Sequence, residues 1–172
     1  REGIERNVRA HLWDEKRQKF IPHIYPEKSP IPEGFDELAI HYHGGTAIAI
    51  EAGLLSKDEI RTVNAQMLEN VRLSGMPSIG LTLYPVYPDG FFHGGMSKAY
   101  LYQNGGDWTW FGGRMIQQLV VNGMVEEAYA EIHPMIERVI QNDGFYEWYG
   151  KGGVPSGSGN FKGSAGVLSK AI

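Results

Sequence analysis

The chain has 172 residues, of which 42% are hydrophobic and 21% are charged, and this is enough for one domain with an apolar core. Its formal net charge of −4 and its lack of a Lys/Arg run argue against a nucleic-acid partner, because phosphate binding requires a basic surface. No apolar stretch is long enough to cross a membrane, and the absence of cysteine excludes disulfides and thiolate chemistry but leaves cytoplasmic, periplasmic and secreted locations open.

The first segment, "REGIERNVRAHLW", has helical periodicity. Its apolar residues Ile4, Val8, Leu12 and Trp13 recur at the spacing of one helix face. The chain begins at Arg1, almost inside this pattern and without a residue that favours an N-cap. We therefore expect a piece of a longer protein, or a product from which a leader has been removed.

Five further segments are predicted to be helical. They cover residues 38–51, 56–73, 110–122, 124–141 and 162–172. The second begins with a capping box, Ser56 and Glu59 in an S-x-x-E pattern. Gly53 and Gly123 are placed to end helices, whereas Pro134 is expected to kink or interrupt the fourth segment.

The connections between these helices alternate in length. "GLLS" and "NG" are tight turns, whereas residues 13–37, 74–109 and 142–161 are long and rich in Pro, Gly and aromatic residues. This alternation predicts an all-α fold, an array of α-hairpins with every long loop on one face. Small β-hairpins are expected within "HLWDEKRQKFIPHIY" and "SIGLTLYPVY". Loops of this length are usually functional.

The histidines do not predict a metal site. His41 and His43 in "HYHGGT" are two residues apart, a spacing that does not bring two helical side chains to one metal ion. The other four histidines show no ligand spacing either, so we predict neither a metal nor a cofactor. The two alternatives are hydrogen-bonded histidines in the core and a role for His43 in binding a ligand hydroxyl.

The stretch "YQNGGDWTWFGG" combines aromatic, polar and glycine residues. Flat apolar faces and paired hydrogen-bonding groups are what a sugar requires, because its ring presents C–H patches and hydroxyls. The predicted sugar-binding residues are Tyr102, Gln103, Asn104, Asp107, Trp108 and Trp110. The alternative is a glycine-rich turn whose tryptophans fill the core beneath it.

The third long loop contains Glu147 between Tyr146 and Trp148. A carboxylate among aromatic rings is partly desolvated, which suits a general base, and Trp148 adds another flat face for a sugar. The alternative is an ordinary exposed glutamate. "GSGNFKGSAG" lacks the P-loop pattern, although free N–H groups at a helix start there are able to bind an anion. No Ser-His-Asp order is present, and paired carboxylates would favour glycosidic chemistry.

Three stretches, "YQNGGDWTWFGGR", "EAGLLSKDE" and "FYEWYGKGGVPSGSGNFKGSAGVLSKAI", resemble the C-terminal half of six-hairpin glycosidases. This superfamily includes glucoamylase, trehalase, debranching α-1,6-glucosidases and the cellobiose-phosphorylase type. The resemblance implies part of an (α/α)6 toroid with its site at the end that bears the long loops. It also implies an inverting glycoside hydrolase without a cofactor. "FYEWYG" corresponds to the stretch that carries the base, so the resemblance assigns that role to Glu147, although Gly150 departs from the glucoamylase pattern.

The resemblance places the general acid upstream of this chain. Asp36, Glu37, Asp107 and Asp143 lie near the long loops, but none matches an acid motif. We therefore expect half a toroid, whose partners are a carbohydrate substrate and either the N-terminal half or another copy of the chain. The alternatives are a phosphorylase, in which residues 162–166 ("KGSAG") hold phosphate, and a non-catalytic carbohydrate-binding protein.

Overall fold

The computed structural model describes residues 2–172, so that Arg1, where the predicted first helix begins, lies outside the described residues. The described chain contains six α-helices: α1 (Glu2–Leu12), α2 (His43–Glu51), α3 (Lys57–Ser74), α4 (Thr109–Val121), α5 (Val125–Gln141) and α6 (Lys162–Ala171). None of the helices within residues 2–172 is long and apolar enough to span a membrane. The predicted all-α class is confirmed.

Three small antiparallel sheets lie in the long connections. Strand β1 (Trp13–Asp14) pairs with β2 (Lys19–Phe20), β3 (His41–Tyr42) with β4 (Leu83–Tyr84), and β5 (Trp148–Tyr149) with β6 (Pro155–Ser156). The same connections contain the short 3-10 helices η1 (Glu37–Ala39), η2 (Gly94–Met96) and η3 (Lys151–Gly153). The hairpin predicted in the first loop is confirmed. The one predicted in "SIGLTLYPVY" is wrong, because β4 pairs with the distant β3.

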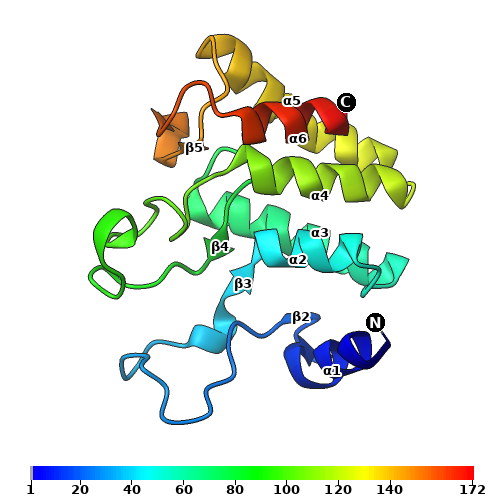
Figure 1. The fold of residues 1–172 in the computed structure, drawn as a ribbon, viewed down its shortest axis with the longest axis vertical. Coiled ribbons are helices and arrows are strands. Elements are labelled where there is room, and N and C mark those ends of the chain that lie inside the picture. Colours follow the sequence, from blue (N-terminus) through cyan, green and yellow to red (C-terminus); the bar gives the residue numbers. More distant parts are fainter. Residues whose placement is uncertain (1) are drawn as a thin grey trace.

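The helices form two layers. Helix α4 packs against both α2 and α6, which makes these three helices one layer, and α3 and α5 pack against α2 and α4 as the second layer. Tight turns link α2 to α3 and α4 to α5, where Gly53 and Gly123 take positive φ values of 77° and 79° that L-residues other than glycine rarely adopt. Residues 21–42, 75–108 and 142–161 lie together at the opposite end of the helices (Figure 1), and we call this end the loop end.

The apolar core lies between the two layers. Helix α3 buries the apolar side chains of Ile60, Val63 and Met67, and the predicted Ser56–Glu59 capping box is present with both of its hydrogen bonds. Helices α4 and α6 approach closely at Gly113, where an added Cβ would lie 2.8 Å from Cγ1 of Val167. The close packing of α4 in the core therefore explains why the "WFGG" stretch has glycines, since a larger residue would not fit there.

Two of the helix predictions require correction. Residues 38–51 do not form one helix: α2 begins only at His43, because the backbone at 41–42 is extended and pairs with residues 83–84. Periodicity cannot reveal a pairing with residues forty positions away. Helix α5 continues through Pro134 as a single element, so the predicted interruption does not occur. Burial of Ile132 and Met135 on either side holds this segment helical despite the lost hydrogen bond.

Candidate functional site

Glu147 lies at the loop end, directly before strand β5. Its backbone N–H donates to the carbonyl oxygen of Ser158 over 2.9 Å. The hydroxyl of Tyr102 donates to Oε1 of Glu147 over 3.4 Å, and the N–H of Ser158 donates to Oε2 over the same distance. Both bonds are long, but they come from two different loops and each holds one oxygen. The carboxylate is half-buried and has a defined orientation.

Gly157 is required for the close approach of its loop to Glu147. Its φ is 71°, and an added Cβ would collide with Oε2 and lie 2.8 Å from Cβ of Glu147. Any larger residue here would push the carboxylate aside, in addition to the backbone strain of a positive φ. The glycine-rich sequence after β5 therefore gives the N–H of Ser158 access to the carboxylate.

Tyr102 connects Glu147 to the aromatic residues of the second loop. It has a φ of 52°, which is uncommon for a large side chain and is typical of functional sites. Its ring meets Trp108 edge-on with centroids 4.9 Å apart and Trp148 with centroids 6.2 Å apart. Burial raises the pKa of Tyr102, and the neighbouring Glu147 adds to this, so its hydroxyl keeps its proton and acts as a donor.

The structure divides the predicted sugar-binding residues into two groups. Gln103 is exposed, and Tyr102, Trp110 and Trp148 are half-buried. Three others are buried, namely Asn104, Asp107 and Trp108, with exposed fractions of 0%, 0% and 5%. A side chain without exposed surface cannot form a hydrogen bond or stacking contact with a sugar. The three buried residues therefore make contacts inside the protein, and the prediction that they bind sugar is wrong for them.

Asp107 belongs to a buried ion pair that fixes β5. Nη1 of Arg138 donates to its Oδ1 over 2.7 Å, and the hydroxyl of Ser78 donates to Oδ2 over 2.6 Å. The guanidinium also lies 4.0 Å from the ring centroid of Tyr149, and the backbones of Asp107 and Tyr149 exchange hydrogen bonds of 2.9 and 2.8 Å. Helix α5 is thereby tied to the strand that follows Glu147.

Asn104 holds Tyr87 in place within the second loop, and Tyr87 contacts the first loop. Its side-chain oxygen accepts from the N–H of Tyr87 over 2.9 Å, and its amide donates to the carbonyl of Tyr87 over 3.1 Å. The hydroxyl of Tyr87 in turn donates to Oε1 of Glu37 over 2.6 Å. The "YQNGG" segment therefore contacts Glu147 through Tyr102 and reaches Glu37 through Asn104.

His43 lies in the interior, where the predicted ligand contact cannot form. It is 0% exposed, its Nε2 lies 3.1 Å from Nδ2 of Asn70, and its ring meets His41 edge-on. Burial holds the pKa of His43 well below its usual range, with a further contribution from His41. Both histidines are thus neutral core residues, which is the first of the two alternatives. Within residues 2–172, no three histidine or acidic side chains are grouped so as to hold a metal ion.

The start of α6, where an anion site was considered, is covered by other groups. The hydroxyl of Ser164 donates to the carbonyl of Tyr146 over 3.0 Å. An added Cβ at Gly163 would lie 2.8 Å from the ring of Phe161 and 3.2 Å from Trp110. These rings pack against the first turn of the helix and restrict the approach of a phosphate.

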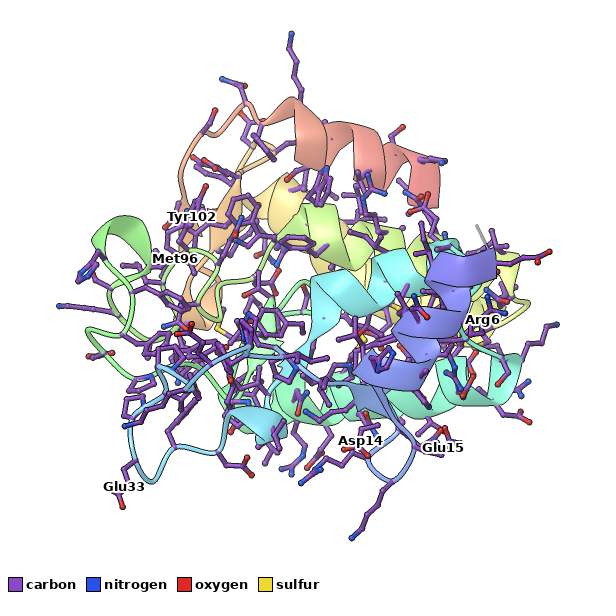
Figure 2. All side chains as sticks on the ribbon, turned by 60° about the horizontal axis from the view of Figure 1, so that its bottom comes forward. Arg6, Asp14, Glu15, Glu33, Met96 and Tyr102 are labelled. Carbon is purple, nitrogen blue, oxygen red and sulfur yellow. The ribbon has the colours of Figure 1, made fainter. Side chains whose placement is uncertain are left out.

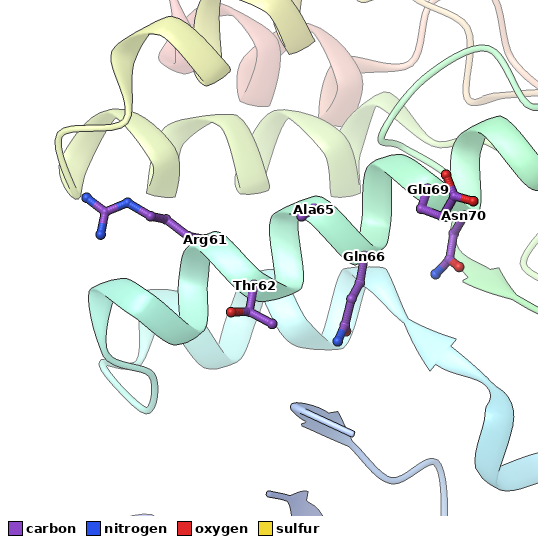
Figure 3. Close-up of a pocket in the computed structure, with 6 residues that line it drawn as sticks. All are labelled: Arg61, Thr62, Ala65, Gln66, Glu69 and Asn70. Atoms are coloured by element: carbon purple, nitrogen blue, oxygen red, sulfur yellow. The ribbon is translucent and has the colours of Figure 1, made fainter. Parts of the chain in front are cut away.

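A hollow of about 630 Å³ lies away from Glu147, along one face of α3, and is lined by Arg61, Thr62, Ala65, Gln66, Glu69 and Asn70 (Figure 3). The amide of Gln66 donates to the carbonyl of Arg17 over 2.9 Å, which links this face to the β1–β2 hairpin. The hollow is open and follows the second helix layer, so we do not assign the chemistry to it.

Sequence reasoning missed three residues that shape the site: Arg138, Tyr87 and Ser158. Arg138 carried a recognisable signal, because a charged residue three positions after Met135 falls on the apolar face of α5 and therefore needs a buried partner. Tyr87 and Ser158 carried no such signal, since their contacts are with residues that only the tertiary fold brings near.

The comparisons with known proteins are structural. No known family and no curated protein matches by sequence. The chain is similar to the GH63 mannosylglycerate hydrolase of Thermus thermophilus in complex with Tris and D-glycerate (TM-score 0.69, 18% identity) and in complex with glucose (TM-score 0.68, 19% identity). In both, 97% of this chain and 36% of the other chain are covered. An uncharacterized conserved protein from the same organism gives a TM-score of 0.68 at 19% identity, with 97% and 37% covered.

These similarities establish the fold. At 18–19% identity they show the fold alone, and the chain spans about a third of the length of the solved chains it matches. The helical hairpins with long loops at one end form part of an α/α toroid, the fold class predicted from the sequence.

Proposed function

We propose that the chain is part of a glycoside hydrolase that acts on an oligo- or polysaccharide with inversion, and that Glu147 is its general base. The observation that carries this proposal is the orientation of the Glu147 carboxylate, which Tyr102 and Ser158 hold at the loop end from opposite loops. The similarity to a mannosylglycerate hydrolase fold supports the reaction class.

In the proposed reaction, Glu147 accepts a proton from a water molecule that attacks the anomeric carbon. The attack comes from the side opposite the leaving group, so the configuration at that carbon is inverted. A second carboxylic acid, roughly 6.5–9.5 Å away, protonates the leaving oxygen. The hydrogen bonds from Tyr102 and Ser158 orient the carboxylate of the base before the substrate arrives.

Asp107 cannot be the general acid, because it is buried in its ion pair with Arg138. We propose that the acid comes from outside this chain, from the remaining part of the toroid or from another copy. The length of the chain, 36% of the similar mannosylglycerate hydrolase, supports this assignment. The accessible sugar contacts are then Tyr102, Trp110 and Trp148 as flat faces and Gln103 as a hydrogen-bonding group.

Hydrolysis is favoured over phosphorolysis. The phosphorylase alternative requires phosphate at residues 162–166, but Ser164 already donates to Tyr146 and the ring of Phe161 lies against Gly163. The rings of Phe161 and Trp110 therefore restrict the access of an anion to the N–H groups of this turn.

The test uses the protein that carries this chain, assayed on a panel of α- and β-linked glucosides and mannosides with and without inorganic phosphate. Glu147→Gln is expected to lower kcat by about 10²–10⁴-fold, the range for loss of a general base, with unchanged folding by circular dichroism. Asp143→Asn is the matched control, because Asp143 is exposed and its φ of 48° suits asparagine.

Unchanged turnover in Glu147→Gln would refute the assignment of the base. Strict dependence of turnover on phosphate would establish the phosphorylase alternative. Glycan binding without turnover in the wild-type protein would establish a non-catalytic carbohydrate-binding protein.

A further inference from the structure

A second carboxylate, Glu37, lies at the loop end in a setting that Glu147 does not share. It belongs to η1 and is 9% exposed. Its Oε1 accepts hydrogen bonds from the hydroxyls of Tyr87 over 2.6 Å and Tyr25 over 2.8 Å, and it lies 2.7 Å from Nδ1 of His23. Burial alone would raise the pKa of Glu37, but these three donors outweigh it and hold the pKa below its usual range.

The hydrogen bonds are distributed unequally over the two carboxylate oxygens. Those that Glu37 accepts from residues 2–172 all end on Oε1, which leaves Oε2 without a partner among the described residues. Oε2 does not belong to the buried side-chain atoms that lack a partner, so it reaches the solvent. It is therefore open to hydroxyl or amide donors of a ligand.

The carboxylate faces a hollow of about 450 Å³, which we call the Glu37 pocket. It is lined by His23, Tyr25, Ser29 and residues 31–38, and its volume is within the range of ~300–1,000 Å³ that small-molecule sites occupy. Ser29 contributes a hydroxyl, and Ile31 and Phe35 contribute apolar surface.

The charge of the lining limits the ligand. Glu33, Asp36 and Glu37 are acidic, and none of the described lining residues is a lysine or arginine, so an anionic ligand would be repelled. A carboxylate oxygen has room for two hydroxyl donors, and adjacent hydroxyls on a sugar ring provide such a pair. The apolar residues suit the C–H face of the same ring.

We propose that the Glu37 pocket binds a neutral carbohydrate unit, with two adjacent hydroxyls donating to Oε2 of Glu37. This site does not depend on the chemistry proposed for Glu147. The first loop, which the sequence assigned no role beyond its two nearby acids, thus becomes a sugar-binding surface at the loop end.

The test is a titration of the protein that carries this chain with methyl α-D-glucopyranoside, followed by the NMR signals of the His23 imidazole. These signals report on the pocket, because Nδ1 of His23 contacts Glu37. We expect saturable shifts for the glucoside and none for D-glycerate at the same concentration. Glu37→Gln should weaken binding by about tenfold or more, the effect of losing charge-assisted hydrogen bonds.

Two control variants complete the design. Glu27→Gln removes an exposed acid of the first loop that does not line the pocket, whereas Glu33, which points outward in Figure 2, does line it; binding by Glu27→Gln should stay within about twofold. Ser29→Trp fills the rim of the pocket without touching the Glu37 hydrogen bonds, so it should abolish binding. This variant keeps the proposal testable if Glu37→Gln fails to fold.

Equal affinity in the wild type, Glu37→Gln and Ser29→Trp would overturn the proposal, as would the absence of glucoside binding or equal binding of D-glycerate. Glu147→Gln should leave the His23 shifts unchanged. A protein that hydrolyses no glycoside but shows these shifts would refute the proposed function and leave this site standing.

Discussion

The hydroxyl of Tyr102 donates to Oε1 of Glu147 across 45 residues of sequence, over 3.4 Å. This contact joins the second loop to the third and gives Tyr102 a role beyond that of a flat face for sugar. The left-handed backbone of Tyr102 costs about 1–3 kcal/mol. This strained conformation places its hydroxyl against the carboxylate of Glu147.

Tyr102→Phe is expected to lower kcat/KM by about tenfold, because a small displacement of a catalytic group slows the reaction. The ring and its packing stay, but the carboxylate of Glu147 loses the hydroxyl that orients its Oε1. Tyr100→Phe is the control, because Tyr100 also has a positive φ, of 61°, but does not contact Glu147. Steady-state kinetics of both variants make the comparison, and an unchanged kcat/KM in Tyr102→Phe would contradict this role.

Gly157→Ala and Gly152→Ala separate backbone strain from displacement of the carboxylate. Their φ values are 71° and 70°, so both substitutions cost about 1 kcal/mol of stability. Only at Gly157 would the new Cβ collide with Glu147; at Gly152 it would meet nothing within 4 Å. Activity should fall by at least about 10²-fold in Gly157→Ala alone, since small displacements of a catalytic group have effects of this size. Equal activities in the two variants would show that the placement of the carboxylate is unimportant.

Arg138→Met is expected to lower the free energy of unfolding by about 3–5 kcal/mol, because it leaves the buried carboxylate of Asp107 without its cation. Arg114→Met is the control. Its ion pair with Glu51 is partly exposed, with side-chain exposures of 28% and 43%, so we expect about 1 kcal/mol or less. Urea denaturation of both variants measures the difference. A loss of under 1 kcal/mol in Arg138→Met would show that the Asp107 pair does not hold β5 in place.

The sequence predicted the elements whose signals are local. The capping box at Ser56, the tight turns at Gly53 and Gly123, and the hairpin after α1 need only neighbouring residues, and all are present. The alternation of loop lengths was enough to place every long loop at one end of the array.

The site could be predicted only in part, because the composition of a segment does not reveal which of its side chains are buried. Asp107 and Asn104 stand in a polar, glycine-rich stretch typical of a binding loop, yet each is buried because Arg138 and Tyr87 supply partners from distant segments. Glu37 was noted only as an acid near a loop. The three donors that gather around it come from positions 23, 25 and 87, and no spacing rule connects these.

Glu131→Gln is expected to make stability less sensitive to pH. Burial raises the pKa of Glu131 from 4.5 to about 7, so the folded protein keeps a proton that the unfolded chain releases above pH 4.5. The contribution of Glu131 to the free energy of unfolding is therefore fully present below pH 4.5 and is lost as the pH rises through about 7. At pH 8 the variant should be more stable by on the order of 2 kcal/mol, and at pH 4 the difference should vanish.

Urea denaturation at these two pH values checks this prediction. Glu137→Gln, on the same helix but 55% exposed at its side chain, serves as the control and should change stability little at either pH. A stability gain in Glu131→Gln that is equal at pH 4 and pH 8 would be inconsistent with a raised pKa.

In the proposed reaction, Glu147 activates water on the face of the sugar opposite the leaving group. The most direct measurement is chemical rescue of Glu147→Ala by azide, in the protein that carries this chain, with an activated aryl glycoside as substrate and NMR of the product. Azide needs no base, so it should restore turnover and give a glycosyl azide with inverted anomeric configuration. Retained configuration in the wild-type hydrolysis product, which would make Glu147 a nucleophile, or a variant that remains as active as the wild type without azide, would contradict the claim.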